Sequence, residues 1–267
     1  MPTLATAMFD LARLLTHVHT GITTDIGTTT TLVDTGLYEP DDHFNNGMLL
    51  IRSGTLAGKL FKVTDYLKGT STIIFSPAGS AAPGIGALYD AVGPEYRRDK
   101  LINAINQALA EFPVLPMENS TLFGVADQVD YTLPVGVSNV FMVEVAKNTA
   151  LPFGYAVSYH WDELPTGVLR FGNGFAPEPG MPIRITYRAA YTFIEDPETD
   201  TISAYVNPAW LAWDAATYAL RDRLREEGRD NSLLVERLNE AKVEERKRKS
   251  QAFLKSMRRT IRWSDVR

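Results

Sequence analysis

The 267-residue chain contains no cysteine and only four histidines. The absence of cysteine excludes disulfide bonds, thiolate metal sites and a cysteine nucleophile. No run of apolar residues approaches the roughly 18 needed for a membrane span. The first 20 residues lack the basic segment and uninterrupted apolar core of a signal peptide. We therefore expect a soluble protein that is made in a cytoplasm and does not bind a membrane.

Recognisable catalytic motifs are also missing, including the Gly-x-Ser-x-Gly nucleophile turn. The glycine-rich segment 168–188, VLRFGNGFAPEPGMPIRITYR, resembles a phosphate-binding loop at first sight. Such a loop must lead directly into a helix, whose N-terminal N–H groups bind the phosphate. Here prolines and then an expected strand follow, which indicates a turn between strands. The acidic segment 195–201, EDPETDT, fits a linker before a helix N-terminus. We expect no enzymatic activity, no catalytic residue and no cofactor.

Potential metal ligands are few. His17 and His19 fall within an expected N-terminal helix, where residues two apart face different sides, so we predict no shared metal. The segment 40–47, PDDHFNNG, lacks the alternating acids of a calcium loop. We interpret it as a polar turn, with a calcium or manganese site as the alternative.

Charge is unevenly distributed along the chain. The net charge is −5, yet residues 221–267 carry 15 Lys and Arg against 9 Asp and Glu, a net +6. Residues 1–220 carry 12 basic and 23 acidic residues, a net −11. An acidic body with a basic C-terminal region indicates that the two parts contact different partners.

Four segments have helical periodicity. The first has apolar residues at helical spacing from Leu4 to Val18 and is expected to stop before Gly21, and the second has Asp99 as its expected N-cap. The third is expected to start with Asn207 as N-cap and Pro208 in its first turn. The fourth begins near Asn231 and is expected to reach about Arg259.

Short strand-like runs separate these helices. The pattern predicts an α+β fold: a helical bundle built from sequence-distant helices, two small antiparallel β insertions and a long C-terminal helix or arm. The expected order is an N-terminal helix (1–30), a first β insertion (31–78), a loop (79–96), a core helix (97–115), a second, sandwich-like β insertion (120–195), a core helix (205–228), and a C-terminal helix with its arm (229–267).

The C-terminal helix changes character along its length. Leu234, Leu238 and Ala241 form an apolar stripe, and the segment 244–251, EERKRKSQ, then has no apolar side chain. A helix that is polar all round does not bury itself on its own domain. Apolar residues return beyond it, at Phe253, Leu254, Met257, Ile261 and Trp263. We predict an arm that docks on another subunit, although a solvated tail is an alternative.

A second alternative is an arm that binds nucleic acid, because many cations would suit phosphates. These cations are Arg246, Lys247, Arg248, Lys249, Arg258, Arg259 and Arg262. The interleaved Glu244 and Glu245, and the returning apolar residues, favour docking on a protein.

Several segments in this order resemble one family. The segments are GMLLIRSGTLAGKLFKVTDYLKGTSTIIFSPA, DKLINAINQALAEF, FGNGFAPEPGMPIRITYRAAY and the Asn-Pro-capped WLAWDAATYAL, followed by a charged helix. Their order, from about residue 31 to 250, is similar to that of the head-to-tail adaptor (connector) proteins of tailed bacteriophages, in the larger type with β insertions.

The resemblance implies a non-enzymatic virion protein at the head–tail junction, assembled in the host cytoplasm. Such adaptors form a ring, usually of twelve copies, below the portal protein and above a tail or nozzle protein. The ring lines the channel through which viral DNA passes. The residues expected to contact the portal or a neighbouring subunit are those of the arm: Arg246, Lys247, Arg248, Lys249, Phe253, Leu254, Met257, Arg258, Arg259, Ile261, Arg262 and Trp263.

An alternative function is that of a tail-associated component that binds or cleaves carbohydrate. The β-rich middle of the chain contains aromatic residues that could form a sugar-binding platform. These are Tyr155, Tyr159, Trp161, Tyr187 and Tyr191. This alternative leaves the charged C-terminal helix without a role.

Overall fold

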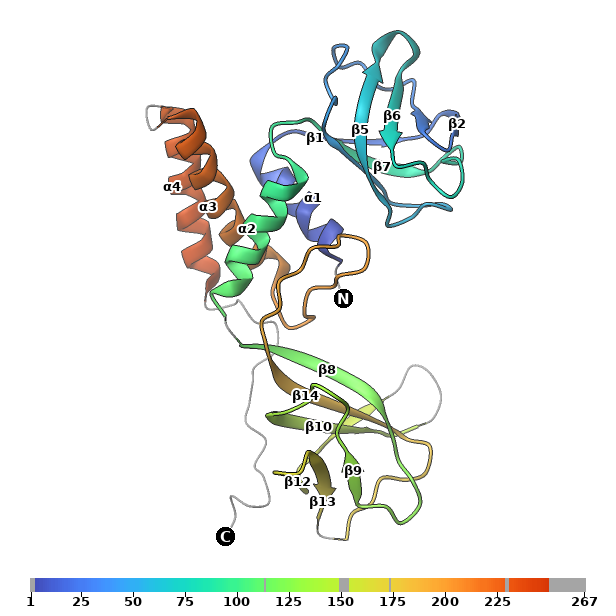
Figure 1. Cartoon of the computed structure of the whole chain (residues 1–267), viewed down its shortest axis with the longest axis vertical. Coiled ribbons are helices and arrows are strands. Elements are labelled where there is room, and N and C mark those ends of the chain that lie inside the picture. The colour runs from blue at the N-terminus through green and yellow to red at the C-terminus, as the bar shows by residue number, and fades with distance from the viewer. Residues whose placement is uncertain (1–2, 113, 149–153, 173, 229–230, 250–267) are drawn as a thin grey trace. The chain divides into compact units, whose positions relative to one another are not determined.

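The structure is a computed structural model that describes residues 3–112, 114–148, 154–172, 174–228 and 231–249 (Figure 1). The chain folds into two compact units. The first unit includes the chain up to Glu111 together with the segment from Phe193 through the last described helix. The second unit runs from Phe112 to Thr192.

The predicted proportions of helix and strand are wrong. The described residues form 14 strands in three antiparallel sheets and only four α-helices, so most of the regular structure is β. The chain is therefore not a helical bundle with two small β insertions. The physical reason is that several strands are covered on both sides and lack the alternating pattern of a half-exposed strand. All four residues of β4 (Met48–Ile51) are buried, for example.

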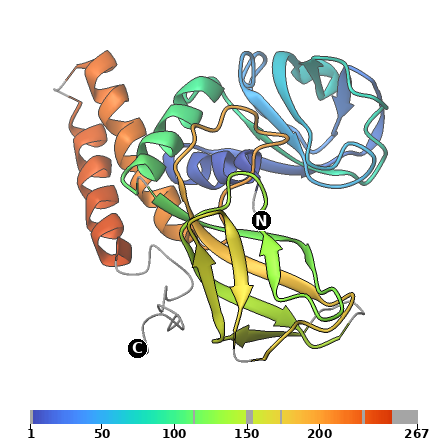
Figure 2. The same cartoon turned by 60° about the horizontal axis from the view of Figure 1, so that its bottom comes forward.

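The four helices belong to the first unit and come from distant parts of the sequence. They are α1 (Leu4–Leu15), α2 (Arg98–Ala110), α3 (Pro208–Glu227) and α4 (Ser232–Lys249). Helix α3 contacts each of the other three, and it runs beside α4 in both views (Figures 1 and 2). Buried alanines of α3 at positions 212, 215, 216 and 219 allow this close packing.

The expected start of α3 is confirmed. The Asn207 side chain accepts hydrogen bonds from the N–H groups of Ala209 and Trp210, and Pro208 occupies the first helical position. Helix α2 begins earlier than expected, because Arg97 is its N-cap and Asp99 lies in its first turn.

Helix α1 ends at Leu15 rather than continuing to just before Gly21. Thr16 is already extended, and its N–H closes the last turn by donating to the Ala12 carbonyl. The Arg237 side chain of α4 donates to the Leu15 carbonyl, which satisfies another acceptor at this helix end. The residues that follow α1 enter the first sheet, so the segment expected to be an N-terminal helix (1–30) is helical only in part.

The seven-stranded sheet contains β1 (Val18–Ile22), β2 (Asp25–Thr28), β3 (Thr31–Val33), β4, β5 (Leu60–Leu67), β6 (Thr72–Ser76) and β7 (Leu88–Val92). A short 3₁₀ helix (Lys68–Thr70) lies between β5 and β6. The strand order is β1-β7-β4-β5-β6-β3-β2. Strands β1 and β2 lie at opposite edges yet are joined by only two residues, Thr23 and Thr24, so the sheet must roll up into a barrel (Figure 1). Its interior holds Tyr66, Phe75 and Tyr89.

Strand β7 lies in the segment 79–96, which the sequence suggested was a loop. It pairs with β1 on one side and β4 on the other, and four of its five residues are buried. The first β body is therefore larger than the expected insertion at 31–78.

The second unit contains two sheets. One has the strand order β11-β10-β14-β8, and the other has the order β12-β13-β9. These strands are β8 (Val114–Phe123), β9 (Asp130–Thr132), β10 (Val140–Ala146), β11 (Tyr155–Ser158), β12 (Trp161–Leu164), β13 (Val168–Phe171) and β14 (Pro182–Ala190). They share a core around the fully buried Trp161.

The glycine-rich segment between Phe171 and Pro182 connects β13 to β14, as predicted. Gly174 and Gly180 have positive φ angles there, which favour glycine in a turn. Across the described part of the chain, no helix combines the length and apolar character required to cross a bilayer.

Candidate functional site

The basic residues predicted to bind a partner begin in the last turn of α4. Arg246, Lys247, Arg248 and Lys249 are consecutive there. Lys247 and Arg248 both form ion pairs with Glu244 on the same helix, at 2.6 and 3.0 Å. Glu244 thus offsets part of the positive charge of this turn, so the turn is less strongly cationic than its four consecutive basic residues indicate.

Lys249 connects this turn to the rest of the helical bundle. Its ammonium group lies 3.1 Å from the Glu111 carboxylate at the end of α2 and 3.7 Å from Glu245 on α4. Glu111 also accepts a hydrogen bond from the Tyr218 hydroxyl of α3, at 3.1 Å. Three helices thus meet at the point where α4 reaches its basic turn.

Asp214 of α3 is buried at this junction, with 3% of its surface exposed. Its Oδ2 atom has no hydrogen-bond partner among the described residues. Burial, followed by the nearby carboxylates of Glu111 and Glu245, raises the pKa of Asp214 to about 7. Lys249 opposes this increase. The junction can therefore take up or release a proton near neutral pH.

The position of Asp214 in the sequence indicates a buried acid, although helical periodicity alone does not single it out. It lies four residues after Trp210 and three before Thr217, on the buried side of α3. An acid in a buried stripe is costly without a compensating partner and is therefore notable. Its neighbour Glu111 belongs to another helix and gives no such signal.

The apolar arm residues fall outside the described part of the chain. They are Phe253, Leu254, Met257, Ile261 and Trp263, and the cations Arg258, Arg259 and Arg262 lie there too. The docking role proposed for these eight residues therefore stays a prediction.

The aromatic residues considered for sugar binding do not form one surface. Tyr155 belongs to β11 in the four-stranded sheet, whereas Trp161 belongs to β12 in the three-stranded sheet. Trp161 is fully buried, and the Arg184 guanidinium covers the Tyr155 ring at 4.0 Å. Tyr159, between the two strands, is exposed.

The carboxylates of the two acidic segments accept hydrogen bonds from nearby backbone and side-chain groups. Asp41 accepts a hydrogen bond from the Lys68 N–H, and Asp42 accepts one from the Asn45 side chain. In the segment 195–201, Asp200 accepts from two backbone N–H groups, and Asp196 accepts from a third and from the Thr199 hydroxyl.

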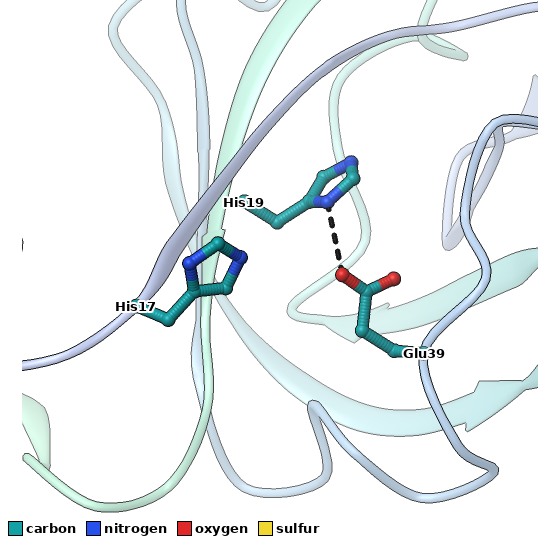
Figure 3. Close-up of side chains that lie close together, drawn as sticks. All are labelled: His17, His19 and Glu39. Carbon is teal, nitrogen blue, oxygen red and sulfur yellow. Dashed lines mark hydrogen bonds and ion pairs between the residues drawn. The ribbon is translucent and has the colours of Figure 1, made fainter.

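The structure brings the two N-terminal histidines together, contrary to the prediction. His17 lies in the short connection after α1, and His19 lies in β1, so both belong to an extended segment in which residues two apart face the same side. Figure 3 shows His17, His19 and Glu39 converging. One potential ligand atom from each lies within 4.8 Å of the others. Glu39 is 20 residues from His19, so sequence spacing could not identify it.

Comparisons with protein-family models and with curated protein sequences find no match to this chain.

Proposed function

We propose that the chain is a structural head-to-tail adaptor of a tailed bacteriophage. In this proposal it assembles as a ring of about twelve copies below the portal protein, joins the capsid to the tail and lines the DNA channel. The proposal rests on the sequence resemblance and on the arrangement of α4, and it assigns no catalytic role.

The position of α4 is the observation that carries the proposal. Among its 18 residues only Leu234, Leu238 and Ala241 are buried, which anchors the helix to α3 by a narrow stripe. Leu233 and Val243 of the same helix are 58% and 49% exposed. A helix that carries apolar side chains outside its own core is suited to contact a neighbouring subunit.

The modular order of the chain also supports an adaptor. One β body, from β1 to β7, is inserted between α1 and α2, and the other, from β8 to β14, between α2 and α3. Each insertion returns the chain to the same group of helices. Such a plan allows the helices to form a ring while the β bodies contact other components.

The carbohydrate-binding alternative gains no support from the described residues, because its proposed platform is divided between two sheets and partly buried.

Native mass spectrometry and electron microscopy of the purified full chain, alone and with the portal protein of the same virion, test the proposal. We expect closed rings under at least one of the two conditions. Val243→Asp and Met257→Asp should each reduce the ring fraction at least several-fold, because each puts a charge in a predicted apolar contact.

Val135→Asp is the matched control, since Val135 is a fully exposed apolar residue in a turn of the second unit. It should leave assembly unchanged. A chain that stays monomeric with and without the portal would refute the proposal. Equal loss of rings in the control variant would show that the α4 surface has no special role.

A further inference from the structure

The cluster of His17, His19 and Glu39 has the ligand types of a zinc site. Imidazole nitrogens and carboxylate oxygens both bind Zn²⁺, and two histidines with one carboxylate leave a fourth position for water. The three residues come from the connection after α1, from β1 and from the loop between β3 and β4. They therefore join two separate backbone segments of the first unit, the extended segment 17–19 and the loop that contains Glu39.

The separation of the two inner ligand atoms suits tetrahedral coordination. His19 Nδ1 lies 3.2 Å from Glu39 Oε1. Two ligand atoms bound to Zn²⁺ at about 2.1 Å and at a tetrahedral angle are about 3.4 Å apart. This pair needs almost no rearrangement. The His17 side chain is exposed, so it can rotate to shorten its longer separation, which is at most 4.8 Å.

Packing holds the two inner side chains in place. The His19 ring stacks on Tyr89, with ring centroids 6.0 Å apart, and meets the edge of Phe44 at 6.1 Å. Glu39 is buried, and its second oxygen accepts the Tyr38 N–H at 3.2 Å. Ligands fixed by their surroundings lose little conformational entropy on binding a metal.

The local charge also favours a cation. Asp34 and Glu39 are both buried, and neither forms an ion pair with a lysine or arginine within the described ranges. Asp34 instead accepts a short hydrogen bond from the Tyr89 hydroxyl, at 2.6 Å. Two buried carboxylates thus lack a permanent positive neighbour, which is costly.

We propose that His17, His19 and Glu39 bind one Zn²⁺ ion through His19 Nδ1, a Glu39 carboxylate oxygen and a ring nitrogen of His17. The ion would tie the connection after α1 to the loop before β4. This metal clamp would stiffen the junction between the helices and the barrel within the first unit. The proposal is independent of the adaptor function.

Isothermal titration of the full chain with ZnCl₂ tests the site. The protein must lack a polyhistidine tag and be stripped of metal beforehand. We expect one ion per chain, and a thermal unfolding midpoint that rises when Zn²⁺ is added. His17→Ala and Glu39→Gln should each weaken Zn²⁺ binding by about tenfold or more. Removal of a residue that only hydrogen-bonds to a ligand already has an effect of this size, and removal of a ligand itself should have at least the same effect. Co²⁺ in place of Zn²⁺ should give the intense visible absorption of tetrahedral coordination.

His43→Ala is the matched control, because His43 is exposed in the same unit but lies outside the cluster. Its affinity for Zn²⁺ should equal that of the unmodified chain. His17 is exposed, so its variant should fold normally, and an unchanged circular dichroism spectrum without metal checks this. The proposal is overturned if the unmodified chain binds no Zn²⁺, if His17→Ala keeps full affinity, or if His43→Ala weakens binding equally.

Discussion

Asp214 should make the stability of the first unit depend on pH in a direction that is unusual for a carboxylic acid. Its pKa is raised from 3.8 to about 7, first by burial and then by Glu111 and Glu245. In the folded chain it is therefore protonated below about pH 7, whereas in the unfolded chain it ionises above about pH 4. Unfolding releases a proton between these values, so stability falls as the pH rises through this window.

The magnitude follows from the two pKa values. The increase from 3.8 to about 7 corresponds to a penalty of about 4 kcal/mol for the ionised form in the folded state. Between pH 5 and pH 8, ionisation of Asp214 should therefore lower the free energy of unfolding of the unmodified chain by about 2–3 kcal/mol. Asp214→Asn keeps the shape of the side chain and removes the ionisation. The free energy of unfolding of the variant, relative to the unmodified chain, should rise by about 2–3 kcal/mol over this range.

Urea unfolding followed by circular dichroism at 222 nm measures this difference, because all the described helices belong to the first unit. Any constant change in hydrogen bonding cancels when the two pH values are compared. Asp222→Asn, two turns along α3 at a less buried position, controls for loss of a negative charge. A difference between Asp214→Asn and the unmodified chain that is constant to within about 0.5 kcal/mol from pH 5 to pH 8 would refute the reasoning.

Four further substitutions test local packing and the cap of α3. Gly47→Ala should destabilise the barrel by about 1–3 kcal/mol in urea unfolding, because its Cβ atom would lie 1.9 Å from the Val92 carbonyl oxygen. Gly69→Ala, with open space around it, should have a much smaller effect. Asn207→Ala should lower the unfolding free energy of the helices by about 1 kcal/mol, since it removes the α3 cap. Trp161→Ala should cost about 3–5 kcal/mol in the second unit, measured by hydrogen exchange of its strands, and an effect below 1 kcal/mol would contradict the assigned core.

Helices were the more predictable part of this fold. The start of α3 follows from local chemistry, because Asn207 and Pro208 favour a helix N-terminus wherever the rest of the chain lies. The end of α1 was harder to predict. Val18 continues the helical spacing of Leu11 and Leu15, yet it belongs to β1. Pairing of β1 with β7, about 70 residues away, decides its conformation, and this information is not local.

The sequence analysis underestimated the extent of β structure for a related reason. Residues 88–92, LYDAV, do not alternate between apolar and polar side chains and follow a segment rich in glycine, alanine and proline. Their strand is paired on both sides and is buried at four of five positions. Periodicity detects strands with one exposed face and fails where the rest of the fold covers both.

The candidate metal cluster depended on the same misjudged helix end. A helix that continued through His17 and His19 would have pointed the two side chains apart, whereas an extended segment points them together. A shift of the helix end by five residues, from Thr20 to Leu15, reverses the conclusion. Glu39 adds a third ligand through the folding of the barrel and has no sequence signal of its own.

The first unit thus contains two places where buried carboxylates lack full compensation, and their surroundings indicate different solutions. At the helical junction, Asp214 is near two other carboxylates and Lys249, with no imidazole, and a proton relieves the charge. At the barrel, Glu39 and two histidines each place a potential ligand atom within 4.8 Å of the others, and this is the one such cluster found among the described residues. Burial alone favours protonation of a carboxylate, whereas a metal ion binds where the lone pairs of several ligand atoms point to one position. We therefore expect Zn²⁺ to stabilise the unmodified chain and Asp214→Asn by the same amount, because the ion acts at the barrel alone.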